Sequence, residues 1–333
     1  MHRFASFGRT PRGRFLSATI LTLSLCGASS ALAQDADIRR TRLSGSNEAI
    51  GLRTAAMGNA FHGGGTGAGA IYANPAGVGL AAIYSFEAGY QHSTRGGTNA
   101  VTAAIVDSKT NRALSAAVGY SFAWSDGETA ADDDNVRDHD LRPVIAFPVS
   151  NRFGLGLGGH AIIRSRGSYV NAESSREDLT ERGFTMSAGA MAMLSDNLAL
   201  GVTVDNLLTN ELFDDIQRGL SAGAGVYVGG LHLEAQYTGS YTPSLKDESG
   251  TILRGGSFGH GGNVGAEYII EGVPLRVGYE LDPQTGDSSI GAGAGYRDER
   301  FGVDATYTQN LTFQDEDGDR SDRRFGVSAS FFF

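Results

Sequence analysis

Residues 51–80 read GLRTAAMGNAFHGGGTGAGAIYANPAGVGL, and this stretch lacks the alternation of side chains that follows Ala82. It begins with a short helical pattern, in which Leu52, Ala56 and Ala60 recur at helical spacing, and continues with the glycine-rich run of residues 63–69. Because glycine has no side chain, other backbone can approach such a run closely. A compact segment of small residues ahead of a long series of strands predicts a plug inside a β-barrel.

The rest of the chain repeats one pattern, in which apolar residues alternate with small or polar ones over about ten residues before a turn. The alternating segments are 85–91, 98–106, 113–124, 139–149, 153–164, 184–194, 198–208, 220–228, 231–241, 257–269, 273–281, 288–296, 301–311 and 324–333. Their number, about fourteen, is even, and each has nearly the length of a tilted membrane strand. The sequence therefore predicts an all-β fold: a transmembrane antiparallel β-barrel of about 14 strands with an N-terminal plug segment.

The predicted connections fall into two groups by length. Tight turns, such as Gly229-Gly230 and Glu271-Gly272, alternate with longer and mostly acidic loops at residues 125–138, 167–182, 209–217, 242–256 and 314–322. Short turns on one side and long loops on the other are typical of a barrel in the outer membrane of a Gram-negative bacterium. Both ends of the barrel sequence then lie on the short-turn, periplasmic side.

The first residues have the pattern of a secretory signal peptide. A basic start precedes the apolar run from Phe15 to Cys26, and Ala31-Leu32-Ala33 forms a cleavage site. The predicted organisation is a signal peptide at 1–33, a plug at 34–82 and a barrel at 83–333. We expect the mature chain to lie in the bacterial outer membrane.

Composition limits the chemistry of the chain. Cys26 is the only cysteine and lies in the predicted signal peptide, which excludes disulfides and thiolate metal sites from the remainder. The net charge of −10 argues against nucleic acid as a partner. The histidines of the mature chain show no metal-ligand spacing. We therefore predict no metal, no cofactor, no catalytic residues and no enzymatic activity.

Two short motifs resemble a known family. Ala56-Met57-Gly58, followed by Asn74, Pro75, Ala76 and Gly77, resembles the N-terminal segment of the FadL family of outer-membrane barrels and of the related PorV-like barrels. The FadL resemblance implies passive passage of a small hydrophobic ligand through a plugged barrel, with long-chain fatty acids as a candidate. It also implies that the Asn74 to Gly77 motif holds the shape of the plug. The PorV-like alternative is a non-conducting barrel that serves as a scaffold or shuttle for secreted proteins.

The end of the chain resembles a second kind of signal. Residues 325–333 alternate apolar side chains and finish with Phe333. This pattern resembles the C-terminal signal that the barrel-insertion machinery reads. The predicted partners are therefore that machinery, outer-membrane lipid, the hydrophobic ligand and, under the PorV-like alternative, secreted proteins.

If the larger apolar side chains face lipid, several charged residues must face the barrel lumen. Charges removed from water need partners. We therefore predict that arginines of the plug pair with acids of the wall, whereas the alternative is a solvated wall without a specific role. The candidate plug residues are Arg39, Arg40, Arg42 and Arg53, and the candidate wall residues are Glu234, Glu267, Glu280 and Asp304.

Two prolines mark a candidate kink in the wall. Pro143 and Pro148 both lie within one predicted strand, where proline removes a hydrogen bond from the ladder. The prolines could simply adjust the register of the strand. The FadL resemblance implies instead a kink that opens the wall sideways, so that a hydrophobic substrate leaves the lumen into the membrane.

Overall fold

Strands dominate the computed structural model, which describes residues 51–94, 97–125, 136–170, 176–208, 218–242, 245–246, 252–254, 256–283, 286–311 and 322–333. The wall consists of β1 (Tyr84–Ser93), β2 (Asn99–Asp107), β3 (Ser115–Trp124), β4 (Val136–Pro148), β5 (Phe153–Val170), β6 (Arg176–Ser195), β7 (Leu198–Asp205), β8 (Arg218–Val228), β9 (Leu231–Thr242), β12 (Ser257–Ile270), β13 (Val273–Leu281), β14 (Ser288–Arg297), β15 (Phe301–Asn310) and β16 (Arg323–Phe332).

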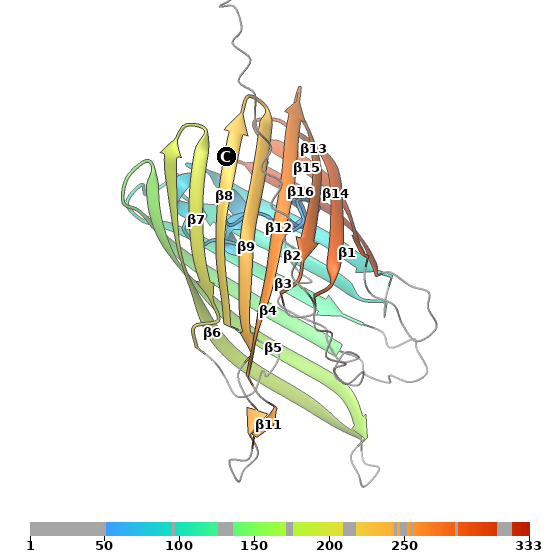
Figure 1. Ribbon diagram of the computed structural model, residues 1–333. Coiled ribbons are helices and arrows are strands. Elements are labelled where there is room, and N and C mark those ends of the chain that lie inside the picture. The colour runs from blue at the N-terminus through green and yellow to red at the C-terminus, as the bar shows by residue number, and fades with distance from the viewer. Residues whose placement is uncertain are drawn as a thin grey trace, which may run out of the picture. The chain divides into compact units, whose positions relative to one another are not determined.

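These strands form a closed antiparallel barrel (Figure 1). Consecutive wall strands pair with each other, and β1 pairs with β16 to close the ring. Phe333 adds to this closure, since its backbone N–H donates to the carbonyl of Tyr84 at 2.9 Å. The predicted fold class, an antiparallel barrel of 14 strands, is confirmed.

One predicted loop is wrong. Residues 167–182 do not form a long loop, because β5 continues to Val170 and β6 already begins at Arg176. The residues in this part of the chain are mostly polar, so they lack the apolar alternation by which a strand is recognised in a sequence. The predicted loop at 242–256 also contains a short hairpin of β10 (Leu245–Lys246) and β11 (Ile252–Arg254).

The two faces of the wall have opposite character. Large apolar side chains such as Ile145, Val264 and Val327 are about half exposed, and they alternate with buried side chains such as Ser115, Thr203 and Ser328. A water-soluble protein would bury the first set and expose the second. An apolar outer surface around a polar interior is the arrangement of a barrel whose outer face meets lipid.

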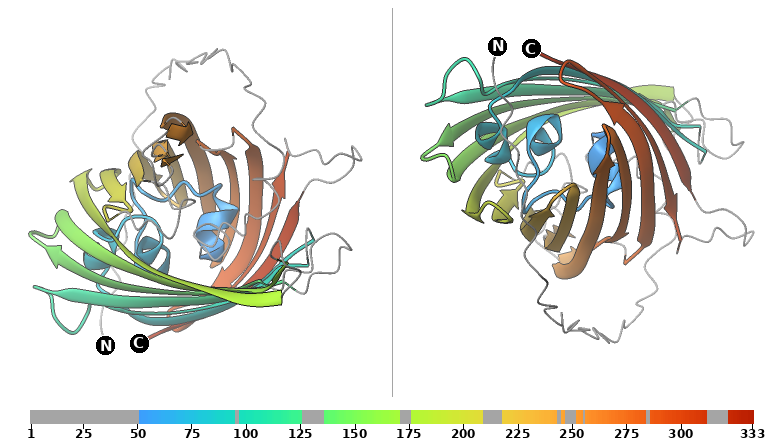
Figure 2. Two further views of the ribbon diagram at one scale, coloured as in Figure 1. Left: turned by 90° about the horizontal axis from the view of Figure 1, so that it is seen from below. Right: turned by 90° about the horizontal axis from the view of Figure 1, so that it is seen from above.

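Residues 51–82, which we call the inner segment, lie inside the barrel (Figure 2). They contain α2 (Leu52–Ala56), the 3₁₀ helix η1 (Gly67–Ile71) and α3 (Gly77–Leu80). The helix α2 ends where Gly58 and Asn59 adopt positive φ values of 61° and 60°, a backbone conformation that glycine and asparagine tolerate. The helix α2 contacts β13 to β16, whereas α3 contacts β3 to β5.

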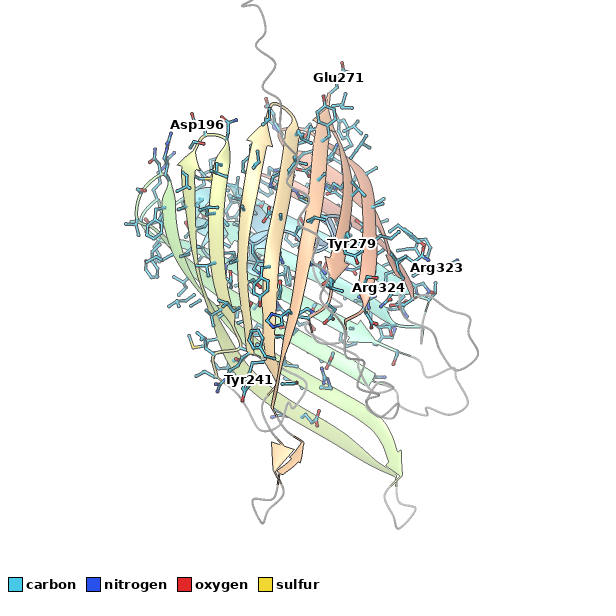
Figure 3. All side chains as sticks on the ribbon, in the orientation of Figure 1. Asp196, Tyr241, Glu271, Tyr279, Arg323 and Arg324 are labelled. Atoms are coloured by element: carbon cyan, nitrogen blue, oxygen red, sulfur yellow. The ribbon has the colours of Figure 1, made fainter. Side chains whose placement is uncertain are left out.

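The barrel has two distinguishable rims. Tight turns such as 196–197, 229–230 and 271–272 join strands at one end, which we call the short-turn rim. The connections at the other end include 125–135, 206–217 and 311–322, and we call this end the long-loop rim. Asp196 and Glu271 mark the first rim in Figure 3, and Tyr241 lies toward the second.

Candidate functional site

The inner segment touches the wall through glycines, and the contact is backbone against backbone. Gly265, Gly278 and Gly291 lie opposite one another on β12, β13 and β14, and all three face residues 55–58. A Cβ atom added at Gly278 would overlap the carbonyl carbon of Met57 and the amide nitrogen of Gly58. Only glycine permits this approach, so these wall positions determine where α2 sits.

The same kind of contact occurs on the other half of the wall. Gly156 and Gly189 form a cross-strand pair on β5 and β6. A Cβ atom at Gly156 would overlap the backbone of Pro75 and Ala76, and one at Gly189 would overlap the side chain of Asn74. The inner segment therefore lies in close contact with wall strands on both sides of the barrel.

Arg53 of the inner segment forms an ion pair with the wall. Its guanidinium binds both carboxylate oxygens of Glu267, with distances of 3.0 Å from Nε and 2.6 Å from Nη2. Glu267 is 2 % exposed and also accepts a hydrogen bond from Arg276 Nε at 2.6 Å. Arg276 in turn pairs with Asp304. This chain of alternating charges satisfies each buried group with an opposite charge, which a buried ion needs.

The other predicted wall acids have different partners. Glu280 accepts a hydrogen bond from Asn59 Nδ2 at 2.7 Å. Glu234 accepts the backbone N–H groups of Gly63 and Gly64. Arg39, Arg40 and Arg42 lie outside the described residues, so among the predicted plug arginines the structure places Arg53.

Neutral side chains, which the charge argument does not single out, hold residues 58–64 of the inner segment. Gln236 Oε1 accepts the backbone N–H groups of Phe61 at 3.1 Å and His62 at 3.2 Å. Tyr227 donates its hydroxyl to the carbonyl of Gly64 at 2.6 Å, and Asn263 donates to the carbonyl of Gly58 at 2.7 Å. A search for inward-facing amides, rather than charges alone, would have found Gln236 and Asn263.

Asn74 is the central residue of the Asn74 to Gly77 motif. Its side chain is fully buried, and Nδ2 donates to the carbonyls of His62 and Ala190, each at 3.1 Å. Its Oδ1 accepts the backbone N–H of Ala76 at 3.1 Å. One side chain thus joins His62 of the inner segment, the wall strand β6 and its own turn.

We expect Asn74→Ala to lower the free energy of unfolding by about 2 kcal/mol, because the carbonyls of His62 and Ala190 would be left buried without a donor. The measurement is urea unfolding of the purified barrel in phospholipid vesicles. Asn151→Ala is the control, since Asn151 lies in an exposed turn at the short-turn rim. Equal stability of the two variants would contradict a structural role for the motif.

A second charged group lines β4 and β5. Arg164 Nε lies 3.0 Å from Asp138, and Asp140 pairs with Arg142 and with His160, each at 2.9 Å. The Arg142 guanidinium lies 5.2 Å from the ring centroid of Tyr72 in the inner segment. Burial raises the pKa of Tyr72 to about 12.

The candidate kink lies at Pro143. The pairing of β4 with β5 runs as far as Leu141↔Ala161 and resumes at Val144↔Gly158, which leaves Arg142 and Pro143 without bridge partners on β5. The pairing of β3 with β4 is continuous through Val118↔Pro143. Pro148 is the last residue of β4, so its place is a strand end and not the middle of a strand.

The gap in the ladder is filled by rings on the outer face. A Cβ atom at Gly159 would lie 3.1 Å from Pro143 Cγ and 3.3 Å from the Phe184 ring. On the inner face, the neighbouring Val144 belongs to an apolar cluster with Val106, Ala146 and residues of the inner segment. The weakest stretch of the β4–β5 pairing therefore adjoins the apolar part of the interior.

Within the described residues, no group of three or more His, Cys, Asp or Glu side chains is placed to hold a metal ion. No helix among the residues that the structure covers is long and apolar enough to cross a membrane.

Solved structures with the same fold include two toluene transporters and a FadL homologue. The toluene transporter TbuX of Ralstonia pickettii is 13% identical, with a TM-score of 0.64 over 85% of this chain and 98% of TbuX. The toluene transporter TodX of Pseudomonas putida is 13% identical, with a TM-score of 0.64 over 85% of this chain and 97% of TodX. A FadL homologue of Pseudomonas aeruginosa is 15% identical, with a TM-score of 0.58 over 85% of this chain and 98% of its own.

The chain has the fold of these two toluene transporters and of this FadL homologue. No family model and no curated protein matches the sequence.

Proposed function

We propose that the chain is a passive channel of the bacterial outer membrane through which a small hydrophobic molecule passes. The observation that carries this proposal is a closed barrel, apolar on its outside, that holds an inner segment against both sides of its wall. In the proposal, residues 34–82 act as the plug, and residues 1–33 are a signal peptide that is removed on export. The C-terminal segment, β16 and Phe333 after it, would be read by the barrel-insertion machinery.

The ligand class follows from two sources. TbuX and TodX are described as toluene transporters, which favours a small aromatic hydrocarbon. The FadL-like motifs favour a long-chain fatty acid. Both ligands would enter the apolar part of the interior more readily than the polar remainder, since burying apolar surface is favourable there. That apolar part is the cluster of Ala70, Ile71, Val78, Ala104, Val106, Ala117, Val144 and Ala146.

We place the exit of the ligand between β4 and β5, beside Pro143. The two strands lack bridge pairing at Arg142 and Pro143, and the apolar cluster reaches the wall at the adjacent Val144. Separating two strands costs least where a ladder hydrogen bond is already absent. A sideways exit also lets a hydrophobic ligand enter lipid without crossing the inner segment.

The test is uptake of labelled toluene and of labelled oleate by cells that carry the protein, compared with cells that lack it. A variant with Pro143→Cys and Gly159→Cys should form a disulfide across the gap, because a Cβ atom at Gly159 would lie 3.1 Å from Pro143 Cγ. The matched control has Ile145→Cys and Leu157→Cys, which replace a cross-strand pair where the ladder is intact.

We expect uptake of at least one ligand by cells with the unmodified protein. Uptake should fall in the Pro143/Gly159 variant and recover with a reductant, while the Ile145/Leu157 control keeps its rate. Equal uptake in both cysteine variants would exclude the β4–β5 exit. No uptake of either ligand by correctly folded protein would reject the channel and leave binding of secreted proteins as the hypothesis to test.

A further inference from the structure

Tyr72 of the inner segment borders the apolar cluster in which we place the ligand. Its side chain is half-buried and packs against that cluster. Its hydroxyl oxygen is buried and has no hydrogen-bond partner among the residues that the structure describes. Such a hydroxyl is costly, because it has given up its hydrogen bonds to water without a replacement. Apolar packing alone therefore does not explain why a tyrosine, and not a phenylalanine, occupies this position.

The Tyr72 hydroxyl lies against a row of inward wall residues that crosses β1 to β4. The successive cross-strand partners in this row are Glu87, Ala104, Gly119 and Arg142. A Cβ atom added at Gly119 would lie 2.9 Å from the Tyr72 hydroxyl oxygen. Because a side chain at that position would crowd the phenol, the glycine allows the hydroxyl to reach the wall.

This row marks one edge of the apolar cluster. The next inward row toward the short-turn rim consists of Val106, Ala117 and Val144, which all belong to the cluster. At the end of the Tyr72 row, Arg142 has no bridge partner on β5 and precedes Pro143, beside which we place the exit. A ligand that moves from the cluster to the exit therefore passes the Tyr72 hydroxyl.

The chemistry of this hydroxyl limits what it can recognise. A phenol is protonated at neutral pH, since its ordinary pKa is about 10, and burial raises the pKa of Tyr72 further, to about 12. The hydroxyl can therefore donate a hydrogen bond to an acceptor atom of a ligand. A pure hydrocarbon has no acceptor and would leave the hydroxyl without a partner.

The charges around the phenol favour an uncharged ligand over a carboxylate. The carboxyl groups of Glu87 and Asp140 and the guanidinium of Arg142 all interact with Tyr72. Arg142, whose guanidinium lies 5.2 Å from the centre of the Tyr72 ring, already pairs with Asp140 at 2.9 Å. A carboxylate ligand would compete with Asp140 for this cation and would also lie near Glu87. An uncharged oxygen meets neither difficulty.

We propose that Tyr72 selects uncharged apolar ligands that carry a carbonyl oxygen, by donating its hydroxyl to that oxygen. The apolar cluster would hold the apolar body of the ligand, and the hydrogen bond would fix the carbonyl beside Gly119. A site that donates a hydrogen bond disfavours an analogue without the acceptor, because the donor is then left buried and unpaired. This inference rests on the proposed channel and names its ligand class more narrowly.

The test is equilibrium binding of two labelled ligands of nearly the same shape to the folded barrel in phospholipid vesicles. Acetophenone has a carbonyl oxygen where α-methylstyrene has a methylene group, and partitioning into protein-free vesicles is subtracted for both. We expect the unmodified barrel to bind acetophenone about tenfold more tightly, the factor that satisfying one buried donor supplies. Tyr72→Phe keeps the ring and removes only the hydroxyl, so it should bind both ligands equally.

The matched control is Tyr90→Phe, because Tyr90 is an exposed, outward tyrosine whose hydroxyl bonds to Asn99. This control should keep the tenfold preference for acetophenone. The infrared carbonyl stretch of ¹³C-labelled acetophenone adds a readout that altered packing would not reproduce, since a hydrogen bond lowers its frequency. The frequency should be lower on the unmodified and Tyr90→Phe barrels than on Tyr72→Phe, and heat-dependent gel mobility should show that every barrel is folded.

The outcomes separate this inference from the channel on which it rests. Equal binding of the two ligands by the unmodified barrel would overturn the role of Tyr72 and leave the channel in place. An unchanged preference or an unchanged carbonyl frequency in Tyr72→Phe would do the same. Binding of neither ligand by the folded barrel would contradict the channel itself, and the ligand class would fall with it.

Discussion

Gly278→Ala is expected to displace the inner segment and to cost about 3 kcal/mol of unfolding free energy, at the upper end of the usual effect of overpacking a closely packed site. The added methyl group would overlap the backbone of Met57 and Gly58, which cannot rotate away as a side chain can. Because Gly265 and Gly291 flank Gly278 in the same row, the neighbouring strands make equally close contacts with residues 55–57 and leave little room for adjustment.

Urea unfolding in phospholipid vesicles measures this loss, with the single tryptophan, Trp124, as the fluorescent reporter. Gly219→Ala is the matched control, because a Cβ atom there would lie 3.4 Å from the Cβ atom of Asp205, an ordinary contact. The control should stay within about 0.5 kcal/mol of the unmodified protein. A Gly278→Ala barrel as stable as the control would show that the inner segment does not rest on this row.

Displacement of the inner segment should also be visible as a leak. Vesicles that carry the Gly278→Ala barrel are expected to release a small polar dye faster than those with the Gly219→Ala control. Lower stability together with faster dye release would indicate a displaced inner segment, whereas lower stability alone would indicate only a less stable barrel.

Glu267→Gln is expected to have the second large effect, a loss of about 3 to 5 kcal/mol. The substitution removes the carboxylate that both Arg53 and Arg276 contact, and the Arg276 side chain is only 2 % exposed. A buried cation that loses its partner carries an uncompensated desolvation cost. Arg276, the buried cation, loses the carboxylate at its Nε and keeps Asp304, while Arg53, whose side chain is 26 % exposed, loses the carboxylate that binds it bidentately.

A double-mutant cycle with Arg53→Gln measures the interaction free energy between Arg53 and Glu267. The double variant should lose less than the two single losses added together, because Arg53 and Glu267 contact each other directly. Glu271→Gln, in the exposed turn between β12 and β13, is the control and should change stability by at most about 0.5 kcal/mol. Strict additivity would mean that the ion pair does not couple the inner segment to the wall.

These contacts bear on the proposed route of the ligand. The Arg53–Glu267 ion pair and glycine contacts tie the N-terminal part of the inner segment to β12 to β14, while Asn74 and α3 tie its C-terminal part to β4 to β6. Movement of the whole segment would break both sets of contacts at once. A sideways exit through the wall near Pro143 requires neither set to break, which is why we place the ligand route there.

The sequence by itself determined the architecture. Side chains of a strand alternate with a period of two, so each membrane strand appears in the local order of residues, and residues 51–80 stand out because they lack that period. The boundaries at β5 and β6 were missed, since their mostly polar extensions carry no such signal. The inward position of Glu234, Glu267, Glu280 and Asp304 also follows from alternation alone.

Only the tertiary structure decided which partner each inward group has. Arg53 and Glu267 are 214 positions apart, and their meeting depends on the register of the whole closed sheet and on the path of the inner segment within it. The role of Gly278 cannot be read from the sequence either. A glycine that contacts another backbone has the same place in the alternation as any small residue that faces the lumen. Alternation assigns a residue to a face, but the contacts across that face arise from elements that are distant in the chain.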